Sequence, residues 1–133
     1  MLNMTANTAY RQVNKFSALE DASPHKLVDM LYTGALEQIA IAKGQIQRHE
    51  VADKGHSLSK AISILEELRR TLDMKQGGEL AQNLHDLYEY MKDRLLQANL
   101  NNDAVLLEEV ERLLGRIQDG WIQIPVELRN KAN

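Results

Sequence analysis

The sequence predicts an all-α protein folded as an antiparallel, up-down-up-down four-helix bundle. The chain has 133 residues, a length that suits one domain. It has two prolines and one Phe, while helix-favouring residues such as Leu, Ala, Glu and Gln are frequent. Apolar residues recur at the three-and-four spacing of amphipathic helices, and no stretch alternates with the period of two that marks a strand.

The first predicted helix starts at Ser23-Pro24 and runs to about Arg48. Ser is a good N-cap, and Pro suits the first helical position because the N–H that it lacks would have no partner there. The apolar residues of this segment cover more than one face, so some apolar surface should remain outside a narrow bundle seam. They are Leu27, Val28, Met30, Leu31, Ala35, Leu36, Ile39, Ile41 and Ala42.

The second helix is expected after a polar break at residues 49–55, and to stop at Gln76-Gly77-Gly78, because glycine readily takes the left-handed conformation that ends helices. Ile64 lies off its apolar stripe. The third helix is expected to begin at Glu79, whose acidic side chain suits the positive end of the helix dipole. A polar cluster at residues 99–103 should end it and cap the fourth helix, whose apolar stripe reaches Trp121.

Short connections between these helices require antiparallel neighbours. We therefore divide the chain into an N-terminal cap segment (residues 1–22), the four-helix bundle (23–124) and a polar tail (125–133). In the cap segment, apolar residues recur every three positions and form a short apolar-faced segment: Tyr10, Val13, Phe16 and Leu19.

Composition argues against several classes of protein. The net charge is −3 and the basic residues are spread along the chain, whereas nucleic-acid binding normally needs a basic stripe. Without cysteine the chain can form neither a disulfide nor a thiolate metal site. No apolar run is long enough to enter a membrane, and the N-terminus lacks the pattern of a secretory signal. We expect a cytoplasmic protein.

The sequence gives no sign of catalysis. Asp53-x-x-His56 is the nearest approach to the Glu-x-x-His pairs of di-metal bundles, and it has no second copy. The glutamates lie between stripe positions and are expected on solvated faces, so we predict no metal, no cofactor and no enzyme. One alternative is a histidine phosphotransfer module, also a four-helix bundle, using His56. Its Lys60 lies one place too far along, and Ala61 replaces the usual glycine.

The order and spacing of several segments resemble the FliS family, the flagellin-specific export chaperones of the bacterial flagellar secretion system. The likeness spans about residues 10–121. It is carried by Ser23-Pro24-His25-Lys26-Leu27, Met30-Leu31-Tyr32-x-Gly34-Ala35, Lys60-Ala61-x-x-Ile64 with Leu68 and Leu72-Asp73, Gly77-Gly78-Glu79-x-Ala81-x-Asn83-Leu84-x-x-Leu87-Tyr88-x-Tyr90-Met91, Leu95-Leu96-x-Ala98-Asn99-x-x-x-Asp103, Glu109-Val110 and Trp121.

This resemblance implies a four-helix bundle without a cofactor, whose client is the disordered C-terminal segment of flagellin. Such a chaperone binds its client in the cytoplasm, prevents premature polymerisation and delivers it to the flagellar export apparatus. An export gate or a co-chaperone would be a further partner. In the family, an N-terminal segment with a tyrosine, which matches Tyr10 here, lies over the client groove.

We expect the partner to contact residues that combine edge-of-stripe apolar or small character with a match to the family positions. These are Tyr10, Ala61, Ile64, Leu68, Tyr88, Leu95 and Asn99. Leu68 and Leu95 also fit an ordinary core, and Asn99 fits a helix terminator. A purely structural bundle that forms a weak homodimer through its surplus apolar surface is a third alternative.

Overall fold

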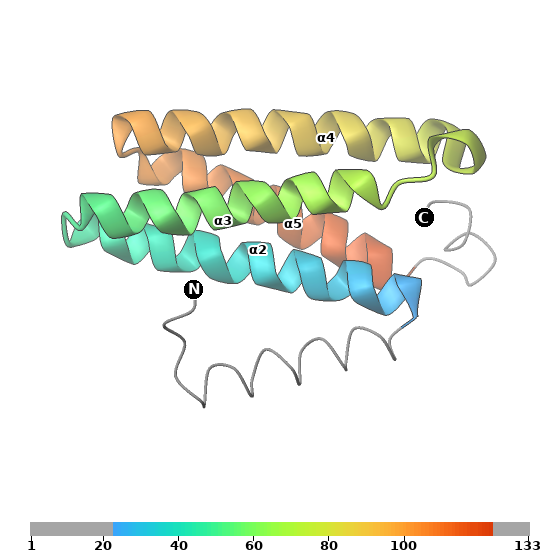
Figure 1. Ribbon diagram of the computed structural model, residues 1–133, viewed down its shortest axis with the longest axis horizontal. Coiled ribbons are helices and arrows are strands. Elements are labelled where there is room, and N and C mark those ends of the chain that lie inside the picture. Colours follow the sequence, from blue (N-terminus) through green and yellow to red (C-terminus); the bar gives the residue numbers. More distant parts are fainter. Residues whose placement is uncertain (1–22, 124–133) are drawn as a thin grey trace, which may run out of the picture.

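The computed structural model describes residues 23–123, which form four α-helices packed as an antiparallel bundle (Figure 1). The helices are α2 (Pro24–Gln47), α3 (Val51–Arg70), α4 (Met74–Asn101) and α5 (Ala104–Gln123). The predicted all-α four-helix bundle is confirmed. The expected cap segment at residues 1–22, with Tyr10, and the tail lie outside the described residues, so the division of the chain into these parts stays a prediction.

Short polar side chains cap the starts of three helices. Ser23 Oγ accepts a hydrogen bond from the Lys26 N–H at 3.1 Å, and Pro24 occupies the first turn of α2. Asp103 Oδ1 accepts from the Val105 N–H at 2.9 Å at the start of α5. These bonds satisfy N–H groups that have no partner inside the helix, so the predicted starts at Ser23-Pro24 and in the cluster at residues 99–103 are confirmed.

The predicted stop of the second helix at Gln76-Gly77-Gly78 is wrong. The helix α3 already ends at Arg70, and Asp73 then accepts a hydrogen bond from the Gln76 N–H at 3.0 Å and caps a new turn. Gly78 (φ 52°, ψ −126°) lies inside α4 as a kink between this turn and the long run that starts at Glu79. The glycine therefore bends one element instead of separating two. The helix α3 also begins earlier than expected, at Val51, inside the polar break.

Each helix packs against two neighbours (Figure 1). Both α2 and α4 contact α3 and α5, so α2 and α4 lie diagonally opposite each other in the bundle. The core along the axis is apolar, and its largest members, Trp121, Tyr32 and Tyr88, lie toward the end where α2 begins and α5 ends. The buried core consists of Val28, Tyr32, Ala35, Ile39, Ala42, Leu58, Ala61, Leu65, Leu68, Leu84, Tyr88, Met91, Leu95, Ala98, Leu107, Val110, Leu114 and Trp121.

Aromatic side chains hold the start of α2 against the end of α5. The rings of His25 and Trp121 stack with their centroids 5.0 Å apart. Trp121 Nε1 donates to the His25 carbonyl at 3.0 Å, and His25 Nε2 donates to the Trp121 carbonyl at 2.7 Å. Because a carbonyl only accepts, His25 carries its proton on Nε2. The two ends of the described chain are thus fixed to each other at one end of the bundle.

Candidate partner-binding surface

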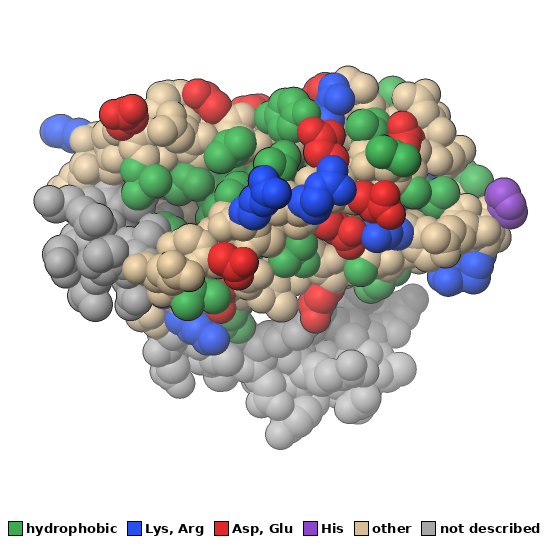
Figure 2. Space-filling model, turned by 180° about the vertical axis from the view of Figure 1, so that it is seen from behind, with side chains coloured by type: hydrophobic (Ala, Val, Ile, Leu, Met, Phe, Trp, Pro, Cys, Tyr) green, Lys and Arg blue, Asp and Glu red, His purple; other side chains and the backbone are tan. Residues whose placement is uncertain are grey.

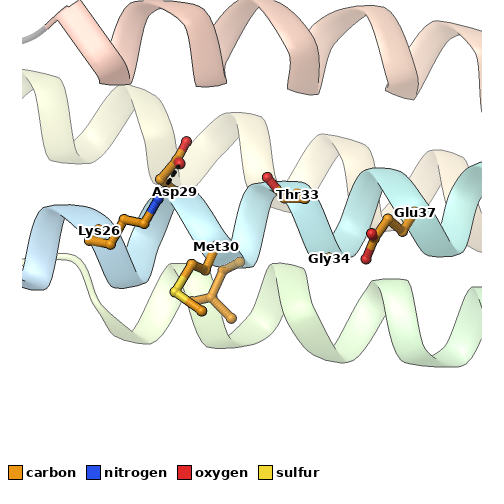
Figure 3. A pocket seen from close by; sticks show the side chains of 7 residues that line it. Lys26, Asp29, Met30, Thr33, Gly34 and Glu37 are labelled. Atoms are coloured by element: carbon orange, nitrogen blue, oxygen red, sulfur yellow. Dashed lines mark ion pairs between the residues drawn. The ribbon is translucent and has the colours of Figure 1, made fainter. Parts of the chain in front are cut away.

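The helix α2 carries apolar residues outside its buried stripe. Val28, Ala35 and Ile39 face the core, whereas Met30 and Leu31 are only partly buried. Together with Gly34 they line a hollow of about 420 Å³ on the outer side of α2, which also includes Lys26, Asp29, Thr33 and Glu37 (Figure 3). The expectation that the first helix has surplus apolar surface is met at this hollow.

Ile64 of α3 approaches the same part of α2. A Cβ atom placed on Gly34 would lie 3.5 Å from Ile64 Cδ1, an ordinary van der Waals distance, so the Ile64 side chain lies next to Gly34. Ile64 also lines a second, open hollow of about 450 Å³ with Gln38, His56, Ser59, Lys60 and Ser63. We call the two hollows and the Gly34–Ile64 contact between them the α2–α3 surface.

Charged groups lie at the edges of the α2–α3 surface. Lys26 Nζ and Asp29 Oδ2 are 3.8 Å apart within α2, and Glu37 is exposed on the same helix (Figure 3). Among the residues that the structure describes, no ion pair joins α2 to α3. An apolar floor with a charged rim and no ion pair across it suits an amphipathic helix that lays its apolar side into the groove.

Other neighbouring helices are joined by ion pairs. Between α3 and α4, Glu66 accepts from Lys92 Nζ at 2.6 Å and from Arg69. The hydrogen bonds from Arg69 and Lys92 lower the pKa of Glu66 to about 2. Between α2 and α5, Lys43 Nζ lies 2.9 Å from Glu111 Oε1, and this hydrogen bond raises the pKa of Lys43. On the reverse side, acidic and basic side chains lie among the hydrophobic ones (Figure 2).

The structure disperses the residues predicted to contact a partner. Ile64 is half-buried and belongs to the α2–α3 surface. Ala61, Leu68 and Leu95 have no exposed area, and Tyr88 is 1 % exposed. A partner lying on this folded bundle would not reach these four side chains, which pack in the core. Their proposed binding role stays a prediction, as does that of Tyr10, which lies outside the described residues.

Asn99 lies in the last turn of α4 and is partly buried. Its carbonyl oxygen accepts a hydrogen bond from Lys54 Nζ at 2.8 Å. This contact is far along the bundle from Gly34 and ties α4 to the start of α3. The contact uses the backbone carbonyl, and α4 continues to Asn101 with Asn102 (φ 51°) as its C-cap. The alternative interpretation of Asn99 as the helix terminator is therefore wrong, and its partner-binding role stays a prediction.

Sequence reasoning missed Met30, Leu31 and Gly34 as members of one surface. The excess of apolar residues in α2 was the available signal, but periodicity gives only the width of an apolar stripe and does not say which neighbour covers it. The close approach of Gly34 and Ile64 depends on how α2 and α3 cross, and spacing along one helix does not specify that.

Neither metal binding nor membrane crossing is indicated within residues 23–123. This part of the chain holds no group of three or more His, Cys, Asp and Glu residues placed to bind a metal ion. It also has no helix that is both long and apolar enough to span a membrane.

The family model "Flagellar protein FliS" matches residues 5–127. The chain belongs to the FliS family. One similar FliS relative, the flagellar secretion chaperone FliSB of Pseudomonas aeruginosa, is 46 % identical over 121 residues, which cover 91 % of this chain and 96 % of the relative. The flagellar secretion chaperone FliS of Salmonella typhimurium is 50 % identical over 117 residues and 87 % of either chain. FliS of Bacillus subtilis is 37 % identical over 116 residues, or 87 % of this chain and 83 % of the relative.

Proposed function

We propose that this protein is a cytoplasmic export chaperone of the flagellar secretion system, which binds the disordered C-terminal segment of flagellin. It prevents premature polymerisation of flagellin and delivers it to the flagellar export apparatus, with an export gate or a co-chaperone as a further partner. The protein acts by binding and not by catalysis. The FliS family match over residues 5–127 carries this proposal, and relatives named flagellar secretion chaperones support it.

The α2–α3 surface is the client site in this proposal. An amphipathic flagellin segment would lay its apolar side against Met30, Gly34 and Ile64, with polar side chains toward Lys26 and Glu37. Burial of apolar area contributes about 25 cal/mol per Å², less the free energy needed to order a disordered segment. The net free energy of binding is therefore well below the contribution of the contacts alone, which suits a chaperone that must release its client.

Isothermal titration calorimetry of the full chain with the C-terminal region of flagellin tests the proposal. We expect a saturable 1:1 complex. Met30→Asp places a charge in the α2–α3 surface and should weaken binding about tenfold or more, because burying a methionine side chain contributes about 1.5–3 kcal/mol. The matched control is Val105→Asp, because Val105 is 68 % exposed in the first turn of α5.

Absence of binding heat and of any complex in wild-type titrations would refute the chaperone proposal. Two outcomes would keep the chaperone role but exclude the α2–α3 surface as the client site. In the first, Met30→Asp leaves the affinity for flagellin unchanged. In the second, Val105→Asp weakens binding as much as Met30→Asp does. The family match favours this role over phosphotransfer by His56, and a wild-type chain that takes no label from a phosphodonor would agree with that choice.

A further inference from the structure

One carboxylate and one ammonium group on the α2–α3 surface have no ion-pair partner among the described residues. In the first hollow, Lys26 and Asp29 pair with each other at 3.8 Å, and Asp29 also accepts a hydrogen bond from Gln118 of α5 at 3.0 Å. Glu37 lines the same hollow, is exposed and forms no such pair. Lys60, which lines the second hollow, is likewise exposed and unpaired within residues 23–123.

These two unpaired charges lie at the same level along the bundle, one on each helix. Because α2 and α3 run antiparallel, the direction toward the end of α2 is the direction toward the start of α3. Glu37 lies three residues after Gly34, about 4.5 Å along α2. Lys60 lies four residues before Ile64, about 6 Å along α3 in the same direction. Figure 3 shows the Glu37 side chain on the edge of α2 nearer α3, whereas Asp29 lies on the other edge.

A surface with a negative edge on α2 and a positive edge on α3 distinguishes the two directions in which a helix can lie on it. When a helix is turned end for end while its apolar side stays against the floor, its two edges exchange places. A helix with basic residues along one edge and acidic residues along the other then changes from attractive contacts to like-charge contacts. Exposed ion pairs are individually weak, but every one of these contacts differs between the two directions, so one direction should be favoured about fivefold or more.

We propose that Glu37 and Lys60 set the direction in which a client helix lies on the α2–α3 surface, which rests on this surface being the client site of the proposed function. The occupant is an amphipathic helix with Lys or Arg along the edge beside α2 and Asp or Glu along the edge beside α3. The apolar floor adds affinity without direction, because hydrophobic contact is non-directional. The charges of Lys26 and Asp29 offset each other and favour neither direction.

Two designed amphipathic peptides of about 18 residues, or about 27 Å of helix, test the proposal on the isotopically labelled full chain. Both have an apolar side of Leu and Ala. The first has Lys along one edge and Glu along the other, and the second has these edges exchanged. Each peptide carries a nitroxide on a single N-terminal cysteine. Because the chain has no cysteine, the label stays on the peptide.

Paramagnetic broadening of the amide NMR signals shows where the labelled end of each peptide lies. We expect the first peptide to broaden one end of the α2–α3 surface, residues 26–30 or 41–45, and the second peptide to broaden the other end, with at least about a fivefold preference at low salt. At 1 M salt, where the Debye length is about 3 Å, the preference should be lost. Broadening of the same end by both peptides, equal broadening of both ends at low salt, or an unchanged preference at high salt would overturn the proposal.

Exchanging the two charges separates their effect from that of shape. The variant Glu37→Lys with Lys60→Glu keeps the net charge and should reverse the direction of both peptides. The matched control is Arg116→Asp with Asp119→Arg, which should leave the direction unchanged. Both control residues are exposed on α5 and form no ion pair with a described residue. An unreversed direction in the folded exchange variant would overturn the roles of Glu37 and Lys60. If that variant fails to fold, the comparison of the two peptides on the wild type still decides.

Failure of this proposal can be told apart from failure of the proposed chaperone function. If neither peptide binds the α2–α3 surface, the proposal is overturned and the surface is excluded as the client site. If both peptides bind there without a preferred direction, only the roles of Glu37 and Lys60 are overturned. If the peptides take opposite directions but the C-terminal region of flagellin does not bind, the chaperone function is overturned and the directing charges stand.

Discussion

The buried pair of tyrosine hydroxyls allows a sharp test of how polar groups contribute to this core. Tyr32 and Tyr88 are 0 % and 1 % exposed, and their hydroxyl oxygens are 2.5 Å apart. Neither hydroxyl has another hydrogen-bond partner among the described residues. Replacing one tyrosine by phenylalanine removes one hydroxyl and leaves the other buried and unsatisfied.

The expected magnitudes follow from this pairing. Each single variant, Tyr32→Phe or Tyr88→Phe, should lower the free energy of unfolding by about 1–3 kcal/mol, the penalty for a buried polar group without a partner. The double variant keeps both rings in place and leaves no orphaned hydroxyl. Its free energy of unfolding should therefore be within about 1 kcal/mol of the wild type, and much closer to it than the sum of the single changes predicts.

Urea unfolding followed by circular dichroism measures all four proteins of this double-mutant cycle. The coupling between the two sites should be about 2–6 kcal/mol, which is close to the sum of the two single losses because the double variant loses little. If the double variant loses the sum of the two single effects, or if each single variant matches the wild type, then the hydroxyls do not depend on each other and the reasoning fails.

Three further outcomes are expected. Burial raises the pKa of both tyrosines, that of Tyr88 to about 12 from an ordinary 10.0. The stabilisation that the neutral tyrosines contribute should therefore be complete below pH 10 and be lost as pH rises toward 12. Alkaline unfolding of the double Phe variant, compared with the wild type, checks this. Glu66 has its pKa lowered to about 2 from 4.5, so its stabilisation is complete above that ordinary value and lost as pH falls toward 2, when Glu66→Gln should match the wild type. Gly78→Ala should destabilise the fold by about 1–3 kcal/mol, because φ is 52° there, whereas Gly115→Ala, in a helix with open space around it, should stabilise it by about 0.5–1 kcal/mol.

Each of these expectations has a contrary result. A double Phe variant with the same alkaline transition as the wild type would contradict the first. A deficit of Glu66→Gln that persists unchanged down to pH 2 would contradict the second. The third fails if Gly78→Ala is as stable as the wild type, since the kink in α4 would then accept a side chain.

The sequence predicted helix number, order and most boundaries, because these depend on local features. Ser23-Pro24 and the cluster at residues 99–103 act on neighbouring N–H groups, and the structure confirms both. Gly78 was misassigned because a glycine can end a helix or kink one. The capping bond that the Gln76 N–H donates to Asp73 Oδ1 starts the helix before Gly78 and so decides which.

The candidate site was less predictable because it depends on contacts between helices. An apolar residue at the edge of a stripe looks the same in sequence whether a neighbour covers it or not. Leu68 and Leu95 are thus fully buried while Ile64 lines a hollow. The burial of Lys54 has no signal in periodicity at all, because a lysine in a helical sequence normally indicates a solvated face.

The stacking and hydrogen bonds between His25 and Trp121 have a practical consequence for labelling this protein. The described chain begins and ends beside these contacts. Lys54 lies near the start of α3, at the opposite end of the bundle, and α3 has 20 residues and is about 30 Å long. A fluorophore attached at Pro24 or at Gln123 would therefore lie at one pole of the bundle. The opposite pole, where α2 passes to α3 and α4 passes to α5, stays free of such a label.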